Sequence, residues 1–297
     1  SGDFRNTAPA FANGYTNVLP NFSFSKSFKK FKTLKFNYTQ RIQRPSLFYL
    51  NPYTNTADPN NLSFGNPQLS PELTRQFELG YSSFWKGTMI NASAFYRHTG
   101  DVIESVLAVD AVGRSLTTFR NVSMVNSYGM NIFGSVSPIA KLTIRGNINA
   151  YYDFITSQIN AAKTNQGISY NANTIVSYTL PKGLSIEGFG FFNSPRRTLQ
   201  GTNPSFSLIN LGMKKELFKK KGSIGLTVSN PFSENKDFTS RLRGDHFYQE
   251  STFSVPFRSI GVNFSWQFGK MEFGQGRKKK GINNDDLKQG SDGQGGM

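Results

Sequence analysis

The sequence predicts an all-β protein, an antiparallel up-and-down transmembrane β-barrel, and three observations support this fold class. Apolar and polar residues alternate along many segments, which is the pattern of strands with one apolar and one polar face. Short connections alternate strictly with long ones, as they do in barrels of outer membranes. Aromatic residues are abundant, with 28 Phe and 12 Tyr, yet no run of about 18 apolar residues exists that could form a transmembrane helix.

The composition narrows the class of protein further. The 297 residues carry 34 Lys and Arg against 18 Asp and Glu, a formal net charge of +16, and no cysteine. Without cysteine the chain has no disulfide, no thiolate metal site and no thiol nucleophile. The charge leaves open a soluble basic β protein that binds nucleic acid. Much of the charge, however, lies in short clusters between predicted strands, so the membrane barrel is favoured and no nucleic-acid partner is expected.

The alternation predicts about 11 strands of membrane-crossing length. They cover 17–28, 32–44, 72–84, 88–99, 117–136, 141–155, 168–180, 184–193, 205–218, 223–230 and 258–268. Within 184–193 the apolar phase slips between Ile186 and Phe189, which predicts a β-bulge near Gly188. The short connections are 29–32, 85–87, 137–141, 180–183 and 218–222. The long ones are 45–71, 101–116, 156–167, 194–204 and 231–251, of which 101–116 could continue as a hairpin beyond the membrane.

The loop lengths and strand phases predict how the barrel lies in its membrane. Short connections are typical of the periplasmic side and long ones of the extracellular side, so ligand contacts are expected from the long loops and lumenal side chains. The polar phase, which would line the lumen, includes Glu78, Arg97 and Arg145. Strand-end aromatics suit the interfacial girdles, among them Tyr81, Trp85, Tyr96, Tyr152 and Trp266. The turn lysines would lie beside inner-leaflet headgroups, with no ligand role expected: Lys29, Lys30, Lys32, Lys86, Lys141, Lys182 and Lys219 to Lys221.

No pattern of residues predicts a catalytic, cofactor or metal site, so the chain is not expected to be an enzyme. The only histidines, His98 and His246, lie far apart and fit polar strand-end or loop positions better than a zinc site. No spacing singles out a Ser-His-Asn trio of the phospholipase type. Four acidic residues lack the frame of a calcium loop, namely Asp58, Asp237, Asp285 and Asp286. Residues 274–276 are no phosphate loop, and lysines 278–280 fit a solvated tail that touches anionic lipid.

One segment resembles a motif of TonB-dependent outer-membrane receptors. It comprises Gly65, Asn66, Pro67, Leu69, Pro71 and Glu72, followed in the next strand by Glu78, Leu79, Gly80 and Tyr81. Arg44-Pro45-Ser46 and Asn51-Pro52 are also similar to that family. The closing aromatic strand, with Phe264, Trp266 and Phe268, resembles the C-terminal signal that the barrel-assembly machinery reads.

The resemblance implies a division of the chain into an extracellular loop remnant (1–16), the C-terminal half of the barrel (17–268) and a disordered periplasmic tail (269–297). Family barrels have about 22 strands, so an N-terminal plug, the TonB contact and the first barrel half are expected to precede Ser1. Some subgroups with a carboxypeptidase-like regulatory domain carry a similar basic tail. The implied function is energised uptake of a scarce, unidentified nutrient across the outer membrane of a Gram-negative bacterium. A passive porin or adhesin-like barrel is the alternative, followed by the soluble basic β protein.

Overall fold

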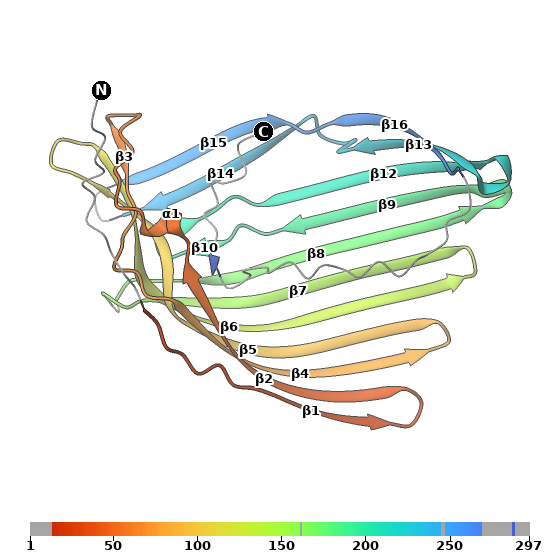
Figure 1. Ribbon diagram of the computed structural model, residues 1–297, viewed down its shortest axis with the longest axis horizontal. Coiled ribbons are helices and arrows are strands. Elements are labelled where there is room, and N and C mark those ends of the chain that lie inside the picture. Colours follow the sequence, from red (N-terminus) through yellow and green to blue (C-terminus); the bar gives the residue numbers. More distant parts are fainter. Residues whose placement is uncertain (1–13, 161, 245–246, 269–286, 289–297) are drawn as a thin grey trace.

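The computed structural model describes residues 14–160, 162–244, 247–268 and 287–288. Eleven strands form one antiparallel sheet in the order β1-β2-β4-β5-β6-β7-β8-β9-β12-β13-β16 (Figure 1). Their bounds are β1 Asn21–Phe28, β2 Lys32–Pro45, β4 Glu72–Trp85, β5 Thr88–Val109, β6 Ser115–Ile139, β7 Leu142–Ser157, β8 Thr164–Leu180, β9 Leu184–Asn193, β12 Phe206–Leu217, β13 Gly222–Ser229 and β16 Ser259–Trp266. Neighbours along the sheet are also neighbours along the described chain except where an extra element interrupts the connection, which is the order of an up-and-down barrel wall.

The remaining elements lie in the connections. They are α1 Leu47–Leu50, β3 Asn61–Ser63, η1 Pro181–Gly183, β10 Arg197–Thr198, β11 Gly201–Thr202, η2 Phe218–Lys220, β14 Asn235–Arg243, β15 Tyr248–Pro256 and β17 Leu287–Lys288. A second sheet has the order β10-β11-β14-β15, while β3 pairs in parallel with β6 and β17 with β2. In the described part of the chain, every helix is too short or too polar to cross a membrane.

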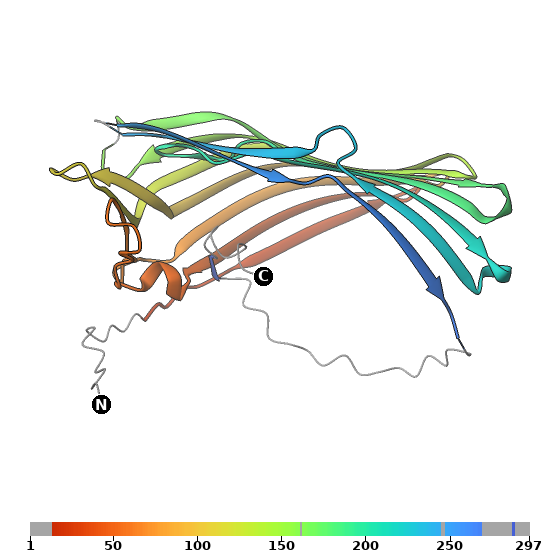
Figure 2. The ribbon, with the colours of Figure 1, turned by 90° about the horizontal axis from the view of Figure 1, so that it is seen from above.

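The large sheet is arched and open. Figure 2 shows it curving so that β1 and β16 bound the two sides of a trough, and each of these strands pairs on one edge only among the described strands. The short connections gather at one end, on the right in Figure 1, and α1, β3 and the β14–β15 hairpin lie toward the other. The sheet is therefore a segment of barrel wall that is not closed, with the sorted loop lengths of an outer-membrane barrel.

Side-chain exposure is inverted relative to a water-soluble sheet. On β6, Tyr128, Met130 and Ile132 are 57%, 54% and 43% exposed, whereas Ser127, on the opposite face of the same strand, is 1% exposed. The register carries each phase across the sheet, because Ile132 pairs with Ala92 and Ile148, while Ser127 pairs with Arg97 and Asp153. An exposed apolar face and a covered polar face suit a wall with lipid outside and polar groups inside.

Cross-strand aromatic contacts stiffen the apolar face. The ring centroids of Tyr38 and Phe77 lie 4.8 Å apart, and those of Tyr96 and Tyr128 lie 5.0 Å apart. Such pairs are worth about 0.5–1.5 kcal/mol beyond the area they bury. They hold the registers in which the apolar phases of neighbouring strands coincide.

The predicted strands agree with the observed ones to within a few residues at each end, except that β5 runs on to Val109, ten residues past the predicted strand end. Two expectations were wrong. The register of β9 runs unbroken through Gly188 on both sides, so there is no bulge there; instead Phe189 and Phe191 lie on the polar face, and Phe191 packs against Phe206 at 5.9 Å. The predicted loop 231–251 contains most of the β14–β15 hairpin. Conversely, β5 and β6 do continue beyond the neighbouring strands, as expected for 101–116. Residues 1–13 of the predicted loop remnant 1–16 lie outside the described residues, as does, apart from β17, the tail 269–297 that was predicted to be disordered.

Candidate functional site

The motif at 65–72 anchors the loop between β2 and β4. The Gly65 amide donates to Asn51 O at 2.8 Å and the Asn66 amide donates to Tyr49 O at 2.6 Å, so the motif runs directly against α1. A Cβ atom at Gly65 would lie 2.5 Å from Asn51 O and 2.6 Å from Tyr49 O. Only glycine permits this approach of two backbones.

Leu69 forms the centre of the main apolar cluster at this end. It is 1% exposed and packs with Tyr49, Leu50 and Ile103, against which Phe119 also lies. The rings of Tyr49 and Phe119 are 4.4 Å apart. The cluster thus joins the α1 loop to the extended part of the β5–β6 hairpin, which reaches past the membrane-spanning wall.

Polar groups of the motif complete the same junction. The Asn66 side chain donates to Phe119 O at 3.0 Å and accepts the Gln68 amide at 2.9 Å, which shapes the turn at Pro67. The backbone of Ser70, next to Pro71, exchanges two hydrogen bonds of 2.9 Å with the side-chain amide of Asn121 on β6.

Glu72 closes the motif at the first residue of β4. Glu72 is 6% exposed, and its carboxylate accepts the Ile103 amide at 2.7 Å. Ile103 follows two register shifts in the β5–β6 pairing, and it lies beyond Gly100, where the pairing of β5 with β4 ends. The carboxylate therefore accepts the hydrogen bond that a neighbouring strand would otherwise accept. The sequence identified this motif by resemblance alone; what it builds, a docked loop, depends on contacts with Asn121 and Ile103 that no local pattern reveals.

The other residues of the family motif lie within strand β4 and have the positions expected of a wall strand. Leu79 and Tyr81 lie on the exposed apolar face of β4, and Glu78 lies on the polar face, where it accepts a hydrogen bond from Gln76 at 3.0 Å. Gly80 pairs with Lys35 and Ser93, and a Cβ there would meet its nearest atom at an ordinary 3.6 Å.

The closing strand β16 carries its aromatic residues on the apolar face. Phe264 and Trp266 are 63% and 37% exposed, and Phe268, just beyond the strand, is 84% exposed. The Trp266 ring lies 4.7 Å from Phe218 in the neighbouring short turn. The geometry is that of an interfacial aromatic belt.

The middle of the polar face holds a covered network. The Ser127 hydroxyl donates to one oxygen of Asp153 at 2.6 Å and the Ser169 hydroxyl donates to the other at 3.3 Å. Arg97 donates to Ser127 Oγ at 3.3 Å, and its guanidinium lies over the rings of Phe95 and Tyr151, at 5.6 and 5.3 Å. Arg97, Glu78 and Arg145, predicted to line the lumen, all lie on this face.

Amide side chains form a row beside this network. Asn131, Asn149, Asn171 and Asn193 are paired directly across four neighbouring strands. Asn149 Oδ1 is buried and accepts no hydrogen bond from a described residue, and the same holds for Asn210 Oδ1. Toward the β1 edge, a cavity of about 360 Å³ lies over β1, β2 and β4 and has only polar lining residues, including Lys35, Arg41 and Glu78. The whole face is suited to contact with water or polar protein groups rather than with lipid.

A strap, residues 194–203 with β10 and β11, crosses this face at the long-loop end. Its Leu199 amide donates to the Glu104 carboxylate of β5 at 2.7 Å. The Gln200 side chain accepts the Leu107 amide at 2.9 Å and donates to Leu107 O at 3.0 Å, which imitates a strand partner along the free edge of β5. Asn165 of β8 donates to Thr198 O at 2.7 Å. The strap then pairs with β14 through β11, so the long connections form one continuous assembly.

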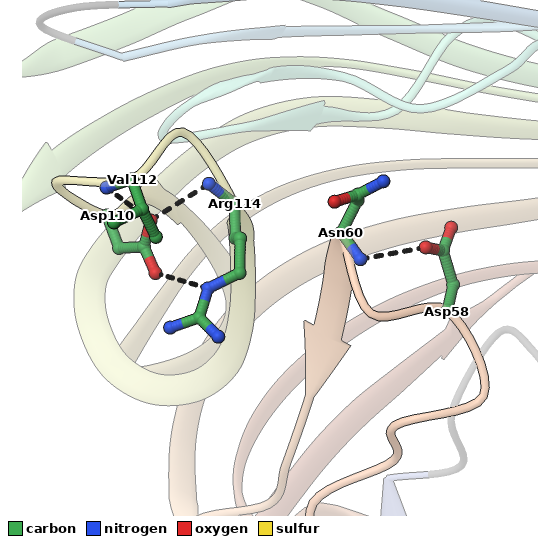
Figure 3. A network of polar contacts seen from close by, with 5 residues as sticks. All are labelled: Asp58, Asn60, Asp110, Val112 and Arg114. Carbon is green, nitrogen blue, oxygen red and sulfur yellow. Dashed lines mark hydrogen bonds and ion pairs between the residues drawn. The ribbon is translucent and has the colours of Figure 1, made fainter.

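Two polar turns lie side by side at the tip of this assembly (Figure 3), joined by the Ser115 amide, which donates to Asn60 O at 2.8 Å. The backbone N–H and side chain of Arg114 donate to Asp110 and hold the pKa of that carboxyl below its usual value; the Arg114 Nε–Asp110 Oδ2 distance is 2.8 Å. The side chain of Asn61 and the amide of Asn60 likewise lower the pKa of Asp58. Both turns are therefore stabilised above the ordinary carboxyl pKa of 3.8 and lose that stabilisation as the pH falls through the lowered values.

Of the two histidines, the described part of the chain contains His98. His98 lies in the middle of β5, close to Gly100 where the pairing of β5 with β4 ends, and its Nδ1 is 2.9 Å from Asn126 Oδ1. His246 lies outside the described residues. Among the residues that the structure describes, no group of three or more His, Cys, Asp or Glu could hold a metal ion.

Solved structures with the same fold are receptors and transporters. The siderophore receptor PirA from Pseudomonas aeruginosa is 15% identical, with a TM-score of 0.55 over 84% of this chain and 42% of its own. A mutant of the ferric enterobactin receptor PfeA from the same organism is 16% identical, with a TM-score of 0.55 over 85% and 40%. The copper transporter OprC is 15% identical, with a TM-score of 0.56 over 84% and 40%. No curated protein matches the chain in sequence.

The chain thus spans less than half the length of each of these structures. At this identity the likeness concerns the fold, an antiparallel barrel wall of the outer membrane. The family model for the outer membrane protein beta-barrel family matches residues 1–266, and the chain belongs to that family.

Proposed function

We propose that this chain forms part of the barrel of a TonB-dependent outer-membrane receptor that takes up a scarce nutrient by energised transport and performs no chemistry of its own. The observation that carries the proposal is the assembly at the long-loop end, where the α1 loop, the β5–β6 hairpin, the strap and the β14–β15 hairpin are joined. Loops fixed in advance lower the entropic cost of capturing a ligand. A passive porin or adhesin-like barrel has less use for such a junction across its polar face.

The remaining parts of a receptor belong to the same proposal. An N-terminal plug and about 11 further strands would complete the barrel, cover the polar face and supply the contact with TonB. A carboxypeptidase-like regulatory domain at the N-terminus would fit the basic tail. Phe264, Trp266 and Phe268 would be read by the barrel-assembly machinery, with the C-terminus in the periplasm. In support, the fold neighbours include receptors for a siderophore and ferric enterobactin and a copper transporter.

The sidedness of the barrel gives a first prediction. An epitope tag inserted beside Asn60, or between Phe232 and Ser233, should bind antibody on intact cells, because both places lie in the long-loop assembly. A tag beside Lys182 or Lys220, in the short turns, should bind antibody only after the outer membrane is permeabilised. Antibody binding at Lys182 on intact cells would show that the topology is inverted.

Energised uptake gives a second prediction, which tests the function itself. Cells that express the intact protein as their sole candidate receptor should accumulate a metal complex, with ferric enterobactin and copper as the probes. A protonophore should reduce this uptake by at least about tenfold, because TonB-dependent transport draws on the proton gradient of the inner membrane. Uptake that persists with the protonophore, together with free passage of small sugars into liposomes carrying the protein, would favour the passive porin.

A further inference from the structure

The short-turn end of the wall is marked by lysines in an unusual backbone conformation. Five lysines have φ between 46° and 72°, in the left-handed region: Lys30, Lys86, Lys182, Lys219 and Lys220. They occupy four of the five short connections. Among the described residues, nine non-glycine residues have positive φ; the only two outside these turns are Asp101 and Asn230.

Lysine is a poor choice for these positions on structural grounds alone. Left-handed conformations strain any residue with a Cβ atom, and tight hairpin turns therefore favour asparagine, aspartate or glycine. Asp101 and Asn230, at the opposite end of the strands, follow that preference. In the short turns the other two strained residues are Phe31 and Phe218, which leaves lysine as the residue that recurs in four of the five turns. A repeated departure toward a cationic residue, at one end of the sheet only, points to a use for the charge.

These lysines are exposed and have few acidic neighbours among the described residues. All five side chains are exposed, as are their neighbours Lys29, Lys141 and Lys221. Two ion pairs among the described residues, Arg114–Asp110 and Arg241–Glu250, lie at the long-loop end. At the short-turn end the acidic residues of the described chain are Glu187 and Glu216, so the positive charge is in large excess there.

Exposed aromatic residues stand beside the lysines and place them at a membrane interface. Phe31, Trp85 and Phe218 are 80%, 68% and 60% exposed, each in or next to one of the turns. Lys86 Nζ lies 5.1 Å from the centroid of the Trp85 ring. Aromatic rings of this kind sit at the level of the lipid headgroups, so a lysine in the adjacent turn is at the level of the lipid phosphates.

We infer that the short-turn lysines form a binding surface for the phosphate-bearing headgroups of anionic phospholipids. The left-handed turn holds each lysine just beyond the aromatic belt, where an ammonium group can meet a phosphate as a compact point charge. The membrane placement follows from the family. The choice of phospholipid over lipid A rests on the proposed function, which puts these turns in the periplasmic leaflet.

The test uses the intact protein reconstituted in membranes that contain spin-labelled phosphatidylglycerol or spin-labelled phosphatidylcholine. Electron paramagnetic resonance gives the preference of the protein-bound shell for one lipid over the other. Lys30→Asn, Lys86→Asn, Lys182→Asn, Lys219→Asn and Lys220→Asn, combined in one variant, should lower the phosphatidylglycerol preference about fivefold or more, since each surface lysine is worth about fivefold. The same variant should unfold at an equal or higher temperature, because asparagine fits the left-handed turns better, so a loss of binding cannot be ascribed to misfolding.

Two matched variants decide the interpretation. The five arginine replacements at the same positions should keep the preference, because they keep the charge. Removal of five exposed basic residues from the other end should change the preference less than twofold: Arg120, Lys163, Arg196, Arg243 and Arg258. An unchanged preference in the five-asparagine variant, or a loss confined to spin-labelled lipid A, would overturn the inference. The antibody and uptake experiments fail or succeed independently of this result, so failure of the proposed function is distinguishable from failure of lipid binding.

Discussion

Produced alone and refolded in detergent, the 297-residue chain should form no closed, heat-modifiable barrel. The sheet ends at β1 and β16, whose eight residues each are exposed along their whole length. Neither strand has a second neighbour among the described residues. Closing the wall on itself with about 11 strands would require a much tighter curvature than the arch in Figure 2 has.

The size of the effect follows from the two edges. An eight-residue edge leaves about half of its N–H and C=O groups without a strand partner. In the absence of water each such group costs on the order of several kcal/mol, so two edges cost on the order of tens of kcal/mol. This exceeds the roughly 5–15 kcal/mol by which folded domains are stable. The isolated chain should therefore aggregate or remain sensitive to protease.

The measurement is gel migration with and without heating, together with protease resistance. The control is co-refolding with a polypeptide that supplies the proposed first half of the barrel, which should restore both properties if β1 and β16 find their partners. A monomeric, protease-resistant and heat-modifiable product from the 297 residues alone would contradict both the open wall and the proposed second half.

The sequence predicted the barrel wall well because the signal for a wall strand lies within the strand's own residues. Its signal is a period of two, and the lipid outside and polar lumen inside enforce that period residue by residue along strands such as β6 and β7. The failure at Gly188 has the same origin. Phe189 and Phe191 break the alternation although the backbone stays regular, because Phe191 packs against Phe206 on the polar side. An aromatic residue on that face looks, in sequence, like a shift of register.

The long-loop assembly was much less predictable. The β14–β15 hairpin carries Lys, Asp, Arg and Glu among its strand residues, so its composition is that of a loop. Its two strands are held together by cross-strand contacts that the sequence does not reveal, such as the stacking of Phe238 on Phe253 at 4.8 Å. The strap depends on Gln200 and Glu104, which are separated by most of a hundred residues of chain. Contacts of that range leave no periodic pattern in the sequence, and the family resemblance identified the motif at 65–72 without predicting what it contacts.

The last prediction concerns the motif that the resemblance identified. Leu69→Ala in the intact protein should release the α1 loop from the β5–β6 hairpin, because Leu69 is 1% exposed at the centre of the only cluster joining the two among the described residues. Truncating a fully buried leucine costs about 2–5 kcal/mol. Chymotrypsin cleavage after Tyr49, itself 6% exposed, should accelerate at least about 30-fold, since cleavage follows the population of the open loop. Gly65→Ala should do the same, because its Cβ would overlap the backbone of Asn51.

Matched substitutions separate this effect from general damage. Leu47→Ala makes the identical change two residues before Tyr49 on a side chain that is 79% exposed, and it should alter cleavage little, as surface changes within about 0.5 kcal/mol do. Gly100→Ala is the control for Gly65, since its Cβ would meet its nearest atom at 3.9 Å. Equal cleavage rates in Leu69→Ala and Leu47→Ala would show that the motif does not hold the loop. Faster cleavage with an unchanged melting temperature would show that the barrel wall is stable without its docked loop, because the wall is held by strand pairing and the loop by this one cluster and its polar border.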